Sequence, residues 1–106
     1  MLIVDMESTY EIESELMPGH VGTFKPVTPR ERGRYTSMIF GGMIGEMPVQ
    51  VFEDHIVNFR PLENAQGNKV PFKKADHLNN IPYEVQAEMG NILLKKNTLN
   101  EEEIKN

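Results

Sequence analysis

The sequence predicts an α+β domain in which an N-terminal β-hairpin, or a small antiparallel sheet, is followed by three to four helices. Residues 8–27 alternate apolar and polar side chains around a Pro-Gly turn, as a hairpin with one buried face does. Three later segments repeat apolar side chains at intervals of three and four, which is the period of a helix face. We expect a single domain over residues 1–97, with a short helix or frayed acidic tail over 98–106.

The hairpin prediction rests on two strands and one turn. Residues 10–16 set the apolar Tyr10, Ile12 and Leu16 between glutamates, which separates the two kinds of side chain onto opposite faces. In the turn over residues 17–20, Pro presets φ at the second position and Gly accepts a positive φ at the third. Residues 21–27 form the return strand, and residues 2–4 are expected to add a short third strand.

The first helix is predicted over residues 28–40. Thr28 is an N-cap, Pro29 suits the first helical position and Glu31 completes a capping box. The two glycines at 41–42 end the helix, and residues 43–47 fit either helix or loop.

A second helix is predicted from Pro48 to residue 59. Its apolar side chains, Val49, Phe52, Ile56 and Phe59, follow helical spacing, and Pro61 closes it. A loop or loose hairpin over residues 62–72 and one helical turn within 75–80 follow.

The last long helix is predicted from Pro82 to about Lys96. Its apolar stripe consists of Val85, Met89, Ile92 and Leu93. Residues 98–101 resemble a further capping box.

Composition argues against several classes of protein and of functional site. The net charge of −5 argues against a dedicated nucleic-acid binder, and no apolar run is long enough to span a bilayer. The chain has no Cys, so disulfides, thiolate nucleophiles and Cys-based zinc sites are excluded. It contains no HExxH pair and no Walker A motif, and we expect no enzyme activity and no cofactor.

One motif could suggest metal chemistry. His55, Asn68 and His77 loosely resemble, in order, the ββα-metal (HNH) nucleases. His55, however, falls inside a predicted helix where such a nuclease needs a strand, and no basic DNA-facing surface is present. We therefore interpret both histidines as ordinary helix-surface or capping residues.

The helix stripes are the remaining candidate for function. An apolar helix stripe usually belongs to the core, but the chain has few aromatic residues to fill the space between its stripes. We expect some apolar surface to remain for a partner, through self-association or by gripping a helix of another chain. The candidate contact residues are Met38, Ile39, Val85, Met89, Ile92 and Leu93.

Four segments carry a family resemblance: residues 24–32 (FKPVTPRER), residues 62–72 (LENAQGNKVPF), residues 81–89 (IPYEVQAEM) and residues 97–106 (NTLNEEEIKN). In this order they resemble a family of small tailed-phage and prophage proteins known as tail assembly chaperones or tail-associated proteins. The resemblance covers roughly residues 24–106, and residues 59–61 replace the family's Gly-Trp before the loop.

This resemblance implies an assembly factor in the host cytoplasm. It would bind a tape measure or tube subunit before tail assembly, and no catalytic residues carry over. From the charge and hydropathy of the chain we expect neither a nucleic acid nor a membrane as partner. Two alternatives stay open. The chain could inhibit a host defence enzyme through an acidic surface such as Glu11, Glu13 and Glu15, or it could be a minor structural protein of the virion.

Overall fold

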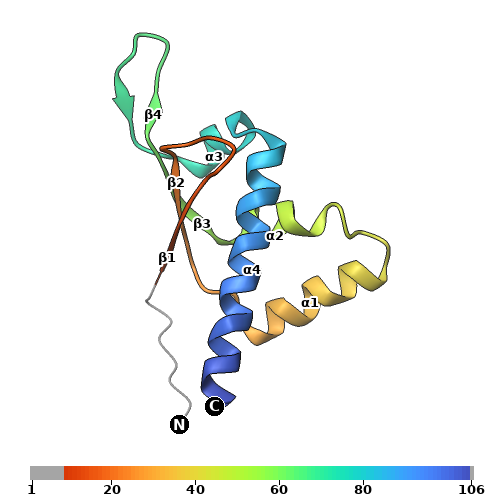
Figure 1. The fold of residues 1–106 in the computed structure, drawn as a ribbon. Coiled ribbons are helices and arrows are strands. Elements are labelled where there is room, and N and C mark those ends of the chain that lie inside the picture. The colour runs from red at the N-terminus through yellow and green to blue at the C-terminus, as the bar shows by residue number, and fades with distance from the viewer. Residues whose placement is uncertain (1–8, 106) are drawn as a thin grey trace.

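The fold combines a small antiparallel sheet with four α-helices, as the sequence predicts. The computed structural model describes the backbone of residues 9–105 and the side chains of residues 9–96. Figure 1 shows the sheet on one side of the long helix α4, while α1 and the loop after it project on the other. The elements are β1 (Tyr10–Glu13), β2 (Val21–Phe24), α1 (Pro29–Phe40), α2 (Met47–His55), β3 (Ile56–Arg60), β4 (Leu62–Glu63), β5 (Lys69–Val70), α3 (Lys74–His77), the 3-10 helix η1 (Leu78–Asn80) and α4 (Tyr83–Lys105).

The predicted hairpin is confirmed. β1 and β2 pair antiparallel, and the turn between them closes with a hydrogen bond of 3.1 Å from the His20 N–H to the Met17 carbonyl. Gly19 takes φ +88°, the conformation for which the turn requires glycine. β1 ends at Glu13, so Leu16 lies beyond the strand and is exposed instead of sharing its buried face. The strand predicted over residues 2–4 lies outside the described residues.

The helix predicted over residues 48–59 is only partly correct. α2 ends at His55, and the chain continues without a loop into β3, which pairs antiparallel with β2. The register passes from Asn58 directly to Ile56, so Val57 is the extra residue of a β-bulge. The bulge turns Ile56 and Phe59, three residues apart, toward the core together. In this bulged strand two residues three apart are both buried, as they would be on one face of a helix. For this reason the apolar pattern predicted a helix.

α1 begins and ends as its sequence predicts. Thr28 and Glu31 form both hydrogen bonds of the capping box, at 3.2 and 3.0 Å. At the other end the Met43 N–H donates to the Met38 carbonyl and the Gly42 N–H to the Ile39 carbonyl. With Gly42 at φ +87°, these bonds make a Schellman motif. Residues 43–47, for which the sequence fits either helix or loop, form a turn over 43–46, and Met47 is the first residue of α2.

The second hairpin and the helical turn after it are also confirmed. β4 and β5 pair antiparallel, and the Asn64 side chain accepts hydrogen bonds of 3.0 Å from the N–H groups of Gln66 and Asn68. The predicted helical turn forms as α3 and η1.

The core lies between the sheet, α2 and α4. It consists of Ile12, Phe24, Val27, Tyr35, Met47, Val51, Phe52, Ile56, Phe59, Ile81, Val85, Met89 and Leu93. α4 has its most extensive contact with α2 and also touches β1. It runs without a break through residues 97 and 98, so no separate helix begins at Thr98 as the capping-box pattern predicted.

Candidate functional site

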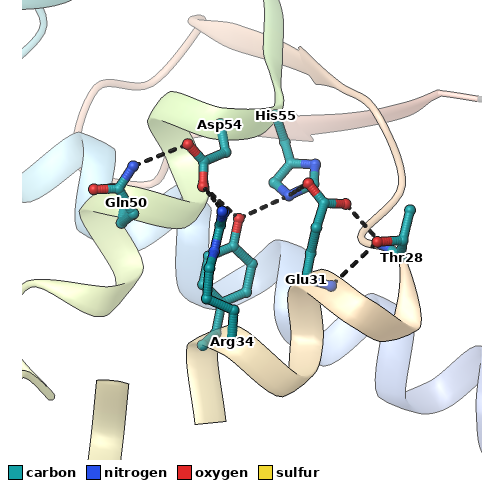
Figure 2. Close-up of polar contacts among 7 residues, drawn as sticks. Thr28, Glu31, Arg34, Gln50, Asp54 and His55 are labelled. Carbon is teal, nitrogen blue, oxygen red and sulfur yellow. Dashed lines mark hydrogen bonds and ion pairs between the residues drawn. The ribbon is translucent and has the colours of Figure 1, made fainter. Parts of the chain in front are cut away.

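A polar network joins α1 to α2 and is the main cluster of charged side chains within the fold (Figure 2). Its members come from the capping box and the inward face of α1 and from one face of α2. They are Thr28, Glu31, Arg34, Tyr35, Gln50, Asp54 and His55.

Asp54 is the acceptor at the centre of this network. Its Oδ2 accepts hydrogen bonds from Arg34 Nη2 at 2.6 Å and from the Tyr35 hydroxyl at 2.7 Å. Its Oδ1 accepts from Gln50 Nε2, one helical turn earlier, at 2.9 Å. Each carboxylate oxygen thus has a donor, which offsets part of the cost of burying this side chain.

His55 is buried beside this carboxylate, with 2% of its surface exposed. Its Nε2 lies 2.9 Å from the Tyr35 hydroxyl and 3.4 Å from Glu31 Oε2. The Tyr35 hydroxyl therefore bridges the Asp54 carboxylate and the His55 ring.

Burial favours the neutral forms of both rings. It lowers the pKa of His55, and the nearby carboxylates of Glu31 and Asp54 oppose the shift without reversing it. Burial, followed by the hydrogen bond to Asp54, raises the pKa of Tyr35 far above its ordinary value. Both rings are therefore neutral near pH 7, and a single hydrogen-bonded chain runs from His55 through Tyr35 to Asp54.

The position of the network indicates what it does. None of its residues lines either of the two cavities described below. The network instead fastens α1 to α2. The interpretation of His55 as a helix-surface or capping residue is wrong. The sequence shows residues 34–35 and 54–55 as two separate pairs of polar side chains. Only the packing of α1 against α2 brings the two pairs into contact.

The larger cavity, of about 590 Å³, lies between the β4–β5 hairpin and α3. It is lined by Leu62, Glu63, Asn64, Val70, Pro71, Lys73, Asp76, His77 and Asn80. A second cavity, of about 330 Å³, lies near Gly19, Arg60 and Lys69.

The three residues that suggested metal chemistry are not brought together. His77 lines the larger cavity, and its Nδ1 accepts a hydrogen bond of 2.8 Å from the Lys73 N–H, which fits the capping role. His55 belongs to the α1–α2 network, and Asn68 lies in the loop of the β4–β5 hairpin. Among residues 9–96, no group of three His, Asp or Glu side chains is arranged to hold a metal ion.

The predicted partner-binding stripe of α4 is buried. Val85, Met89 and Leu93 have at most 2% of their surface exposed, and Ile92 is half-buried against the same core. The expectation that this stripe faces outward is therefore wrong, because α2 and the sheet cover it. Of the two α1 candidates, Met38 is half-buried and only Ile39 is exposed.

Exposed apolar side chains gather instead where α1 ends. Ile39 is 39% exposed, Phe40 86%, Met43 44% and Ile44 64%, and we call these four residues the apolar patch. The Schellman motif fixes the backbone between them. The Tyr83 hydroxyl, at the start of α4, donates to the Gly45 carbonyl at 2.9 Å and holds the loop against the body. Sequence analysis named Ile39 but missed the other three, because a helix end and its loop have no apolar period.

The acidic row on β1 is less free than its sequence indicates. Glu11 forms an ion pair of 3.1 Å with Arg60, and Glu13 accepts a hydrogen bond of 3.4 Å from the Gly19 N–H. Glu15 lies beyond the end of the strand. The structure therefore offers no straight row of three unpaired carboxylates in this region.

Neither a membrane-spanning helix nor a relative among known proteins was found for the described chain. In the part of the chain that the structure describes, no helix has both the length and the apolar character needed to cross a bilayer. A scan against protein-family models, a search of the curated proteins and a search of the solved structures each found no match.

Proposed function

We propose that this chain is a non-catalytic assembly factor that binds a tail protein, a tape measure or a tube subunit, before the tail is built. The apolar patch is its contact surface. The observation that supports the proposal is the exposure of four neighbouring apolar side chains, with Phe40 almost fully in water. Single exposed apolar residues are ordinary, whereas a group on one segment is typical of a protein interface. The tail protein as partner follows from the sequence resemblance.

The patch is also held in shape before any partner arrives. Its backbone is fixed by the hydrogen bonds from Met43 to Met38 and from Gly42 to Ile39, and by Tyr83 on Gly45. A preorganised surface loses less conformational entropy on binding, so more of the contact energy appears as affinity. Burial of an exposed Phe side chain contributes roughly 1.5–3 kcal/mol, which makes Phe40 the expected centre of the interface.

The proposal is tested by Phe40→Asp, with Leu16→Asp as the matched control. Leu16 is a second exposed apolar residue, 59% exposed, in the β1–β2 connection. We expect Phe40→Asp to weaken binding to the tape measure or tube subunit by about ten-fold or more, and Leu16→Asp to have little effect. Urea unfolding should place both variants near the wild-type midpoint, because both side chains are already in water. Equal affinities of Phe40→Asp and wild type would refute the proposal.

A second measurement separates an assembly factor from a virion component. An assembly factor leaves before the particle is complete, so we expect mass spectrometry of purified virions to lack peptides of this chain while infected-cell lysates contain them. Stoichiometric amounts in virions would favour the structural role instead.

A further inference from the structure

We infer that the partner segment covering the apolar patch is a basic amphipathic helix, with an apolar stripe flanked by Lys or Arg. The inference rests on the proposed function and names the chemistry of the partner. It follows from the charged side chains of the segment that contains the patch, residues 35–52, and of the segment around Tyr83, residues 78–87, which are acidic.

The two segments that build the patch and its surroundings carry only acidic charge. Residues 35–52, which contain the patch, include one charged side chain, Glu46, and neither Lys nor Arg. Residues 78–87, which flank the Tyr83 whose hydroxyl bonds to Gly45, also include one, Glu84. Both glutamates are exposed. An apolar surface with this border attracts cationic groups and repels anionic ones.

The C-terminal end of α1 adds to the negative electrostatic potential of these glutamates. A helix carries partial negative charge at its C-terminus, and a Lys or Arg in the last turn would offset it. The last turn of α1 contains no basic residue. The partial negative charge at the C-terminus of this 12-residue helix therefore lies at Phe40, its last residue.

The same charges disfavour a second copy of this chain as the occupant. A two-fold dimer would place the patch of one copy against the patch of the other. Glu46, Glu84 and the end of α1 would then face their own counterparts, which costs free energy through like-charge repulsion. Anionic membranes and nucleic acids are repelled for the same reason.

A helix is the expected form of the partner segment. The patch consists of side chains from a helix end and a turn, and no strand of residues 9–105 lies beside it (Figure 1), so an extended peptide finds no described strand edge to pair with here. Recognition therefore depends on side chains. An amphipathic helix presents an apolar stripe with charges on both flanks in a single element.

The test uses the full chain and two synthetic peptides of about 18 residues, long enough for several helical turns. Both carry the same Leu stripe, flanked by Lys in one peptide and by Glu in the other. We expect the Lys peptide to bind about ten-fold tighter or more, with an affinity that falls as salt rises from about 50 to about 500 mM. Phe40→Asp should abolish this binding. Glu46→Lys combined with Glu84→Lys should reverse the preference, whereas Glu15→Lys combined with Glu53→Lys, the same charge change elsewhere, should keep it.

The outcomes distinguish this inference from the proposed function. Equal binding of the two peptides, binding of neither, or a preference unchanged by the Glu46 and Glu84 reversals would overturn the basic-helix inference. The proposed function would still stand if Phe40→Asp weakened binding to the tail protein. A dimer of the chain alone that Phe40→Asp dissolves would also overturn the inference, since a second copy would then occupy the patch.

Discussion

Gly90 on α4 lies directly against the carbonyl group of Pro48 in the first turn of α2. A Cβ built on residue 90 would overlap the Pro48 oxygen and lie 2.8 Å from its carbonyl carbon. Glycine within a helix costs about 1 kcal/mol relative to alanine, yet here its missing side chain lets the two helices touch through their backbones. This close approach positions the most extensive helix contact of the fold.

Gly90→Ala should therefore destabilise the chain, against the usual preference for alanine in helices. Neither the Pro48 backbone nor α4 can move aside without disturbing the core, so we expect a loss of about 1–3 kcal/mol in the free energy of unfolding. Gly33→Ala in α1 is the matched control, because a Cβ there meets nothing within 4 Å. It should stabilise by about 0.5–1 kcal/mol. Urea unfolding of both variants measures the difference, and effects of the same sign would contradict this account of the helix crossing.

Glu88 connects α4 to the segment after β1. Its carboxylate accepts hydrogen bonds from the Ser14 hydroxyl at 2.6 Å and from the Glu15 N–H at 2.7 Å. Hydrogen bonds to charged groups contribute about 1.5–3 kcal/mol, so Glu88→Ala should lower the free energy of unfolding by an amount in this range. A double-mutant cycle with Ser14→Ala should give a coupling energy of about 0.5 kcal/mol or more. Additive losses would mean that the two side chains stabilise the fold independently.

Removal of the Tyr35 hydroxyl should loosen α1. Tyr35→Phe keeps the buried ring but deprives Asp54 of one donor and His55 of its nearest hydrogen-bond partner. We expect a loss of about 1–3 kcal/mol, together with faster amide hydrogen exchange in α1 than in α4. Tyr83→Phe removes an exposed hydrogen bond and should cost only about 0.5 kcal/mol. Uniform acceleration of exchange across the chain would show that the network does not act on α1 in particular.

The stability of the fold should depend on the protonation of His55. Burial lowers its pKa in the folded chain below the value of about 6.5 expected in the unfolded chain. Between these two pKa values the unfolded chain binds one more proton than the folded chain. The contribution of His55 is therefore complete above about pH 6.5, and the free energy of unfolding falls as the pH drops through this window.

His55→Gln provides the control for this pH dependence. Glutamine can still donate a hydrogen bond but does not titrate, so the variant should lose part of the slope of unfolding free energy against pH below about pH 6.5. Urea unfolding at several pH values measures the slope. Identical slopes for the variant and the wild type would show that His55 does not titrate differently on folding.

Much of the local structure could be predicted because its causes are local. The turn over residues 17–20, the capping box of Thr28 and Glu31 and the glycines after α1 each satisfy backbone groups within a few residues. The partner-binding surface was harder to predict from the sequence. A stripe such as Val85, Met89 and Leu93 has the same pattern whether it faces the core or a partner, and only the neighbouring elements decide which.

The sequence by itself determined the α+β class, the N-terminal hairpin, the ends of α1 and the start of α4, because short-range hydrogen bonds and backbone preferences are sufficient for these. Only the tertiary structure decided that residues 56–60 form a strand, since their pairing with β2 and the bulge at Val57 involve partners distant in the chain. It also decided the burial of His55 and the exposure of Phe40, because solvent access depends on which helices and strands pack together.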